Sequence, residues 1–168
     1  STGQPKGVMV EQGGVVNLIH WMRAAYPLSF EDRVLCRTSI SFDAAAWEIW
    51  LPLVSGATTC LPHNNVVRDL ESLMGQIDHH KITVVQFVPS LLSAILATKI
   101  QKPSSVRLVC CGGEPLTKEM ADRVASLWNT YLVNFYGPTE ATIQSTHYQC
   151  AEGRGTTTIT PIGRPIAN

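Results

Sequence analysis

The first segment whose residue types could do chemistry is STGQPKG, which places two glycines, two hydroxyls and one lysine within seven residues. Glycine lets backbone N–H groups approach an anion closely, and hydroxyl and ammonium groups add donors. The segment therefore fits a phosphate group, with Ser1, Thr2, Gly3 and Lys6 as candidate donors. Its spacing differs from G-x-x-x-x-G-K-[ST], which excludes a P-loop NTPase. Taken alone, it equally fits an ordinary polar loop.

A second segment, SFDAAAWE, combines a carboxylate with small residues and an aromatic ring. Asp43 stands where a helix is expected to begin, and Trp47 lies four residues later on the same helical face. An acidic residue in that position usually caps the helix. The alternative is a carboxylate beside small alanines and a tryptophan wall, arranged to receive an ammonium group.

Two more segments follow strand-like runs. CGGEP begins at Cys111 and is either a plain connection from strand to helix or a backbone that passes flat against a purine. NFYGPTE begins at Asn134 and gathers an amide, an aromatic ring, a hydroxyl and a carboxylate at one strand end. Tyr136 could stack on a base and Thr139 could donate to a phosphate. Glu140 could hold Mg²⁺, an ion that takes few protein carboxylates.

Hydrophobic patterning predicts the elements that must position these segments. Short, continuous apolar strands alternate with helices, which predicts an α/β fold with a mostly parallel sheet covered on both faces. Ligands in such sheets bind at the carboxyl ends of strands, here the loops after Thr38, Cys111 and Phe135. The expected strands are 7–10, 33–37, 57–61, 83–88, 106–111, 131–135 and a β-like segment at 144–149. The expected helices are 15–22, 43–54, 70–77, 89–97 and 117–128.

Composition excludes several classes of protein. The 168 residues are 45% hydrophobic and 15% charged, and 13 basic residues balance 13 acidic ones. This argues against a disordered chain and against a basic nucleic-acid binder. No apolar run approaches the roughly 20 residues of a membrane span. The five cysteines are irregularly spaced, which favours buried, reduced thiols in a cytoplasmic protein over a disulfide framework or a zinc site.

Together and in this order, the four segments resemble the adenylate-forming, AMP-binding enzymes, and most of all the amino-acid adenylation domains of non-ribosomal peptide synthetases. S-T-G-x-P-K-G is similar to the family's phosphate-binding loop, and S-F-D-x-x-x-W-E, G-G-E and N-x-Y-G-P-T-E are similar to its later landmarks. TITPIGRP, at 158–165, resembles the stretch that follows them. The resemblance covers the whole chain, whereas the chain covers only the middle of the family's domain.

The resemblance implies an incomplete domain with a flavodoxin-like fold. The N-terminal subdomain, the ribose-binding Asp and the C-terminal subdomain with its catalytic Lys are expected outside residues 1–168, so the fragment alone should be inactive. The implied reaction uses ATP and Mg²⁺ to form an aminoacyl adenylate and pyrophosphate. The acyl group then passes to the phosphopantetheine thiol of a carrier domain. Carrier and condensation domains are the implied partners, with neither nucleic acid nor membrane.

The resemblance also assigns roles by motif. Thr2 and Lys6 belong to the loop on the β- and γ-phosphates, Thr139 touches the α-phosphate and Glu140 ligates Mg²⁺. Lys6, Thr139 and Glu140 are the residues implied in the chemistry. The implied nucleotide contacts are Ser1, Thr2, Gly3, Lys6, Gly112, Gly113, Glu114, Asn134, Tyr136, Gly137 and Thr139. Among these, Asn134 and Tyr136 hold adenine, and the backbone of 112–114 lies along its other edge.

Asp43 matches the acid that pairs with the substrate α-ammonium, which separates amino-acid activation from the activation of fatty or aryl acids. The remaining pocket positions are, by register, Ala44, Trp47, Gln86, Val109, Cys111, Phe135, Ile143 and Gln144. Two amides in an otherwise apolar pocket favour a polar substrate such as glutamine, because an unpaired buried amide costs about 1–3 kcal/mol. Alternatively, the two amides pair with each other or with backbone. A ligase of non-amino acids and a non-catalytic nucleotide-binding or scaffold fragment stay open as further alternatives.

Overall fold

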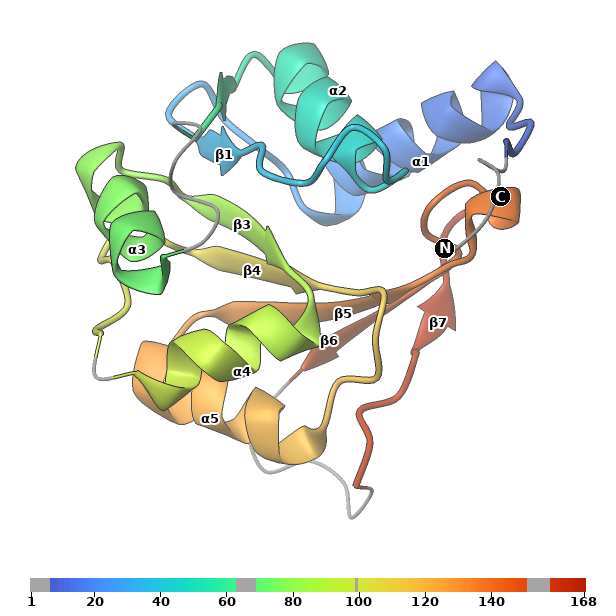
Figure 1. Cartoon of the computed structure of the whole chain (residues 1–168). Coiled ribbons are helices and arrows are strands. Elements are labelled where there is room, and N and C mark those ends of the chain that lie inside the picture. Colours follow the sequence, from blue (N-terminus) through green and yellow to red (C-terminus); the bar gives the residue numbers. More distant parts are fainter. Residues whose placement is uncertain (1–6, 63–68, 99, 151–157) are drawn as a thin grey trace.

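A computed structural model describes residues 7–62, 69–98, 100–150 and 158–168 of the chain. Ser1, Thr2, Gly3 and Lys6 of the predicted phosphate loop lie outside these residues. The described residues form one seven-stranded sheet between two layers of helices (Figure 1). Its strands, in spatial order, are β2 (Thr58–Cys60), β1 (Arg33–Leu35), β3 (Val84–Phe87), β4 (Leu108–Cys111), β5 (Tyr131–Tyr136), β6 (Thr146–Cys150) and β7 (Arg164–Pro165).

The strands from β2 to β5 are parallel, and β6 and β7 add an antiparallel edge. This confirms the predicted α/β class with a mostly parallel sheet. The parallel order brings the carboxyl ends of β1, β3, β4 and β5 together at one end of the strands. Each helix returns the chain to the amino ends before the next strand begins. The loops that carry the sequence motifs therefore meet there.

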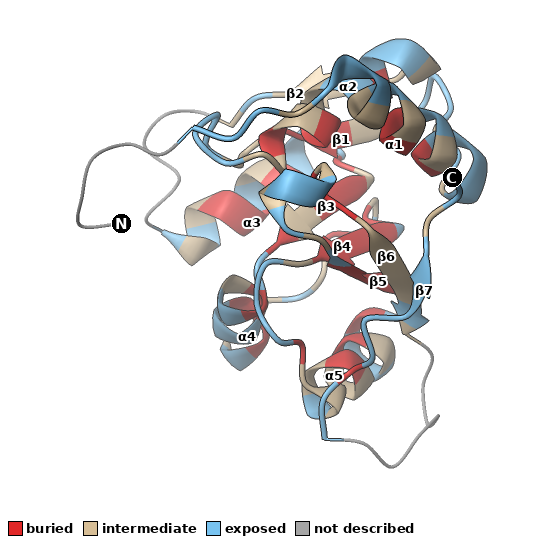
Figure 2. Cartoon of the chain, turned by 90° about the vertical axis from the view of Figure 1, so that its right-hand side faces the viewer, coloured by how far each residue is buried: buried red, intermediate tan, exposed pale blue. Residues whose placement is uncertain are grey.

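The helices divide between the two faces of the sheet. The helices on one face are α1 (Gln12–Ala25) and α2 (Ala45–Ser55), and those on the other are α3 (Leu70–His79), α4 (Pro89–Ala97) and α5 (Lys118–Trp128). Side chains alternate between the faces, so Val84 packs under α1 and α2 while Val85 packs against α3 to α5. Both layers between sheet and helices are buried (Figure 2). No helix in the described part of the chain is long and apolar enough to cross a membrane.

Two short segments differ from the sequence expectation. The predicted strand at 7–10 is wrong: these residues form no strand, and Met9 is 100% exposed. A short apolar run becomes a strand only where a neighbouring strand is there to pair with it, and no strand of the described ranges pairs with 7–10. The sequence analysis also omitted β7, because two residues, one of them proline, carry no periodic signal. The structure places β7 beside β6, with His147 paired to Arg164.

A buried carboxylate ties together the amino ends of three strands. Asp32 precedes β1, and its oxygens accept hydrogen bonds from Arg107 Nε (2.7 Å) and Nη2 (2.9 Å), from Thr83 Oγ1 (2.7 Å) and from Ser29 N (2.8 Å). Thr83 precedes β3 and Arg107 precedes β4. Burial by itself would raise the pKa of Asp32, but the hydrogen bonds from Arg107, Ser29 and Thr83 outweigh it and lower the pKa to about 2.

We therefore expect Asp32 to stabilise the fold in a pH-dependent way. Because its pKa is lowered on folding, the contribution is fully present above the unfolded-state pKa near 3.8 and is lost as pH falls through about 2. Urea unfolding at pH 6 and at pH 2 should show Asp32→Asn removing roughly 2 kcal/mol more at pH 6 than at pH 2. Asp78→Asn is the control, since its pair with Lys81 is solvent-exposed. Equal losses for Asp32→Asn at both pH values would contradict this role.

Candidate functional site

A cavity of about 580 Å³ lies over the carboxyl ends of the parallel strands. It is lined from the loops after β1, β4 and β5 and from β3, as the topology requires. Most of the predicted substrate contacts meet there: Asp43, Ala44, Gln86, Cys111, Phe135, Ile143 and Gln144. The cavity is also lined by four of the residues predicted to contact the nucleotide: Gly112, Gly113, Glu114 and Gly137.

Two predicted substrate contacts lie outside the cavity lining. Trp47 is fully buried in the core between α2 and the sheet, and its Nε1 donates a hydrogen bond to Gln86 Oε1 at 2.5 Å. Val109 is also fully buried, and its side chain points to the opposite face, toward α3 to α5. Both residues therefore belong to the buried core next to the cavity and not to its lining. Gln86 pairs neither with Gln144 nor with backbone, as the sequence analysis had allowed, but with Trp47.

A second cavity, of about 380 Å³, adjoins the first. The two share wall residues Gly113, Glu114, Phe135 and Gly137. Asn134 and Tyr136, the residues predicted to hold adenine, line this second cavity. Tyr136 is half exposed, whereas Asn134 is buried and donates from Nδ2 to the Pro161 carbonyl at 3.0 Å.

Asp43 does not cap α2. The cap position is Ala44, with no side-chain cap bond, and the Asp43 side chain has no hydrogen-bond or ion-pair partner among the described residues. Its half-buried carboxylate instead lines the larger cavity. Of the two interpretations of Asp43 that the sequence left open, the structure therefore favours a carboxylate available to a ligand.

Helix α2 begins beside the cavity because the next polar residue along it, Glu48, holds the loop after β1. Glu48 is completely buried, and its carboxylate accepts hydrogen bonds from Thr38 N at 3.0 Å, from Thr38 Oγ1 and from Arg37 N. Burial raises the pKa of Glu48, although these hydrogen bonds and the nearby Arg37 charge lower it in part. Sequence reasoning missed this role; the signal was a single acid inside an otherwise apolar helix.

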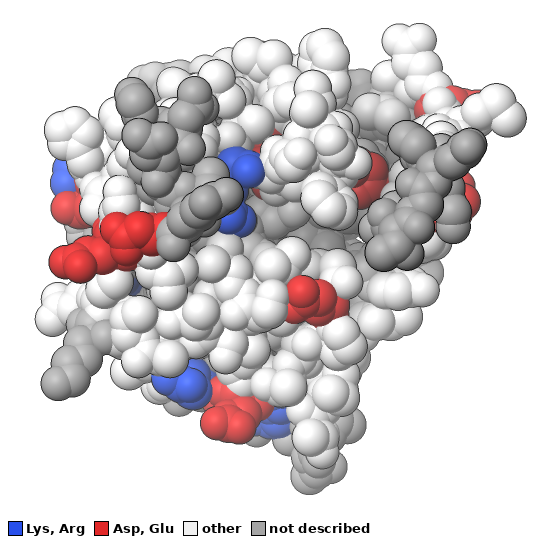
Figure 3. All heavy atoms as spheres, in the orientation of Figure 1, with Lys and Arg blue, Asp and Glu red and all other residues white. Residues whose placement is uncertain are grey.

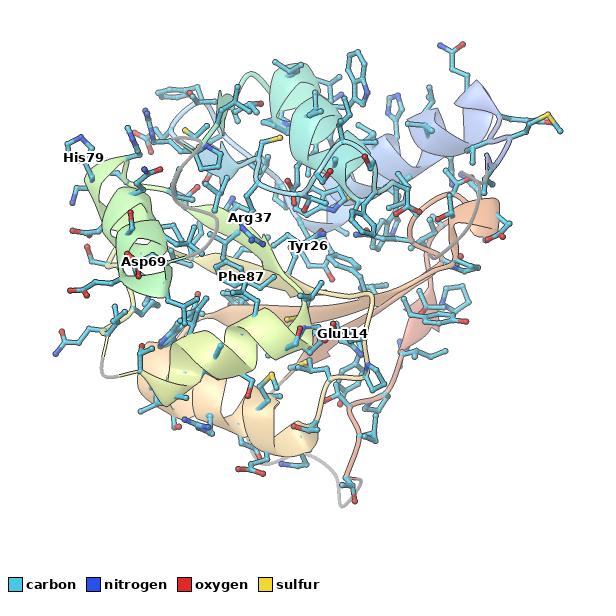
Figure 4. The ribbon with its side chains drawn as sticks, viewed as in Figure 1. Tyr26, Arg37, Asp69, His79, Phe87 and Glu114 are labelled. Atoms are coloured by element: carbon cyan, nitrogen blue, oxygen red, sulfur yellow. The ribbon has the colours of Figure 1, made fainter. Side chains whose placement is uncertain are left out.

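Arg37 is a further cavity residue that sequence reasoning missed. Its side chain leaves the loop after β1 and reaches the space between α2 and the sheet, while Glu114, from the loop after β4, lies beside the start of α4 (Figure 4). The Nε of Arg37 is buried without a hydrogen-bond partner in the described part of the chain. Glu114, by contrast, is engaged: it accepts from Ser90 N at 2.9 Å and Ser90 Oγ at 3.0 Å. Charged side chains are sparse on this side of the molecule (Figure 3).

The wall between the two cavities depends on two glycines. Gly113 has φ +84°, a left-handed conformation that glycine adopts without strain. A Cβ on Gly137 would lie 2.6 Å from Ile143 O and 2.7 Å from Gln144 Cα, so the turn after β5 can close only over glycine. That turn also holds Thr142 and Ile143 at φ +62° and +69°, a strained conformation for β-branched residues.

Gln144 is held by this turn as one wall of the larger cavity. Its side chain is 4% exposed, and its Oε1 is buried with no hydrogen-bond partner among the described residues. A buried acceptor without a partner costs about 1–3 kcal/mol. The site therefore contains an unmet hydrogen-bonding requirement that a ligand can satisfy.

Glu140 and Thr139 lie in a short 3-10 helix, η2 (Thr139–Ala141), which begins two residues after the shared wall residue Gly137. Neither lines the two cavities, and Glu140 is exposed. No group of three or more His, Cys, Asp or Glu able to hold a metal occurs among the described residues. A single exposed carboxylate nevertheless fits Mg²⁺, which usually keeps waters and binds substrate phosphates beside one or two carboxylates.

The AMP-binding enzyme family model matches residues 1–168, the whole chain. Over its full length the chain is 44% identical to the phosphinothricin tripeptide synthetase PhsB of Streptomyces viridochromogenes and 41% identical to tyrocidine synthase 3 of Brevibacillus parabrevis. It spans 14% and 3% of those proteins. The Vibrio cholerae adenylation domain AlmE, solved with glycyl-adenosine-5'-phosphate, overlays 98% of the chain with a TM-score of 0.88 and 28% identity. The chain spans 31% of AlmE.

The chain belongs to the AMP-binding enzyme family, whose model it matches from end to end. Its relatives among the non-ribosomal peptide synthetases and the adenylation-domain overlay confirm the resemblance inferred from the four sequence segments. The individual site residues stay predictions.

The close approach at Gly137 gives a direct test of the wall. Gly137→Ala should lower the free energy of unfolding by roughly 1–3 kcal/mol, because the new methyl group overlaps the backbone of the 143–145 turn. Gly75→Ala in α3 is the matched control: a Cβ there meets nothing within 4 Å, and alanine should stabilise the helix by roughly 0.5–1 kcal/mol. Denaturant unfolding checks both variants, and equal behaviour would refute the close approach.

Proposed function

We propose that the protein takes part in amino-acid activation, forming an aminoacyl adenylate and pyrophosphate from ATP. The observation that carries this proposal is the unpartnered Asp43 carboxylate in a cavity that shares a wall with a second cavity bearing Asn134 and Tyr136. An ammonium group beside Asp43 leaves the substrate carboxylate free to face that wall. A nucleotide in the second cavity can present its α-phosphate to the same wall.

In the proposed reaction, a substrate carboxylate oxygen bonds to the α-phosphorus of ATP and the bond to the β-phosphate breaks, releasing pyrophosphate. Asp43 orients the amino acid, and Tyr136 stacks on adenine while Asn134 borders its edge. The backbone of 112–114 forms the base's other boundary. Thr139 donates to the α-phosphate, where negative charge develops during transfer. Mg²⁺, held by Glu140, supplies electrostatic stabilisation of the phosphoryl oxygens when bound.

Ser1, Thr2, Gly3 and Lys6 complete the proposed nucleotide site as donors to the β- and γ-phosphates. Their glycine-rich, hydroxyl-bearing composition supports this role. We place the 168 residues in the centre of a larger adenylation domain, since they span only 31% of the AlmE chain they overlay. Upstream and downstream subdomains, the latter with a catalytic Lys, belong to that domain in this proposal.

The same proposal sets the partners of the reaction. The adenylate passes its acyl group to the phosphopantetheine thiol of a carrier domain, and condensation domains then use the thioester. The similarity of this chain to 3% and 14% of two peptide synthetases supports these partners. The substrate is a polar amino acid such as glutamine, because Gln86 and Gln144 both line the cavity. The reaction takes place in the cytoplasm, in keeping with five free cysteines.

Asp43 provides the first test. In a complete adenylation domain that carries this sequence, Asp43→Ala should lower kcat/KM for amino-acid-dependent ATP–pyrophosphate exchange roughly 10- to 150-fold, because a charged hydrogen-bond partner of the ammonium is lost. Asp78→Ala, at an exposed position on α3, is the matched control and should leave exchange unchanged. Undiminished exchange in Asp43→Ala would show that no ammonium binds there and would favour a ligase of non-amino acids.

The proposed domain organisation is tested separately. Residues 1–168 alone should give no amino-acid-dependent exchange, because the proposed catalytic Lys and ribose contacts lie outside them. Equilibrium binding of ATP to the same chain, compared with Tyr136→Ala, measures the nucleotide site independently of turnover. Exchange by the 168-residue chain would contradict the domain proposal. Equal ATP binding by both forms would remove Tyr136 from the proposed site.

A further inference from the structure

The contact between Trp47 and Gln86 fixes which end of the Gln86 amide meets the cavity. An indole N–H can only donate a hydrogen bond, so the atom it meets at 2.5 Å must be the amide oxygen. The other end of the amide, Gln86 Nε2, then has no hydrogen-bond partner among the described residues. Since Gln86 lines the larger cavity, it presents a hydrogen-bond donor there.

Gln144 supplies the opposite group to the same cavity. Its Oε1 is buried without a partner in the described part of the chain, and its side chain is 4% exposed. The terminal torsion of glutamine has a broad profile, so the amide can turn its oxygen to a ligand without moving the backbone. The cavity thus offers one donor and one acceptor, framed by the apolar side chains of Phe135 and Ile143.

We infer that Trp47 acts as a positioning residue that makes this cavity select a primary carboxamide side chain over the isosteric carboxylate. The inference rests on the proposed amino-acid activation and names its substrate class. A carboxamide oxygen accepts from Gln86 Nε2 while its NH₂ group donates to Gln144 Oε1. A carboxylate has no donor for Gln144, an ammonium has no acceptor for Gln86, and an apolar side chain leaves both amides unpaired.

Arg37 is the one feature of the described lining that would favour an acidic side chain. Burial lowers the pKa of Arg37, and attraction to the nearby buried Glu48 carboxylate offsets this lowering in part. The positive charge of Arg37 thus offsets a charge already present in the fold. Glutamic acid is therefore the decisive competitor in any substrate comparison.

The experiment measures ATP–pyrophosphate exchange in a complete adenylation domain carrying this sequence, first with all twenty amino acids and then with glutamine, glutamate, methionine and lysine in detail. Glutamine should exceed the other three by on the order of 10- to 100-fold in kcat/KM, because each competitor leaves a buried polar group unpaired. Trp47→Phe removes the N–H and frees the Gln86 amide to turn. It should therefore lower the glutamine-to-glutamate ratio about tenfold, mainly through KM.

Two further variants distinguish a change in substrate selection from a general loss of structure. Gln144→Met leaves Trp47 untouched and should raise methionine relative to glutamine, even if Trp47→Phe folds poorly. Gln149→Leu changes an exposed glutamine on β6 and should leave every ratio unchanged. A general loss of structure lowers exchange for all substrates together, so only a change in ratio supports a positioning role.

The outcomes separate the inference from the function on which it rests. Exchange driven best by glutamate or by an apolar amino acid would overturn the carboxamide assignment and leave amino-acid activation intact. An unchanged glutamine-to-glutamate ratio in well-folded Trp47→Phe would overturn the role of Trp47. Absence of exchange with all twenty amino acids would overturn the proposed function and this inference with it.

Discussion

The docking of helix α2 above the sheet edge is the constraint on which the site depends. Two adjacent residues fix it: Glu48 accepts hydrogen bonds from the loop after β1, and Trp47 donates one to Gln86 on β3. The start of α2 is thereby held over two parallel strands at once. Asp43 and Ala44, which precede the helix, come to line the cavity because that start cannot move away from the sheet.

Burying Glu48 is costly, and the fold offsets that cost locally. A carboxylate with no exposed surface loses its hydration, and backbone N–H groups and a threonine hydroxyl replace it. At the opposite edge Asp32 plays a comparable part for the amino ends of β1, β3 and β4. Polar networks thus fix both ends of the parallel strands, and at the carboxyl ends the buried Gln144 Oε1 has no partner among the described residues.

The sequence predicted the fold well where one physical signal dominated. The buried run 108–111 is apolar throughout, as a strand covered on both faces must be, and Thr117 caps α5 as its position indicated. The site was predicted through motifs that follow those strands. The Trp47–Gln86 contact was not predictable, because it joins residues 39 apart and depends on which way an indole ring turns. Nor was the contact from Asn134 to the Pro161 carbonyl, which holds the segment before β7 against β5.

Two local rules of protein structure are broken where the cavity is built. Thr142 and Ile143 occupy a left-handed conformation that disfavours β-branched residues, and the next residue, Gln144, keeps a buried oxygen without a described partner. Neither feature stabilises the fold on its own, and a turn selected only for stability would avoid both. Together they fix the Gln144 backbone in the cavity wall, with its amide oxygen left without a partner among the described residues. The strain and the unmet hydrogen bond are therefore best explained as the energetic cost of preorganising a binding wall.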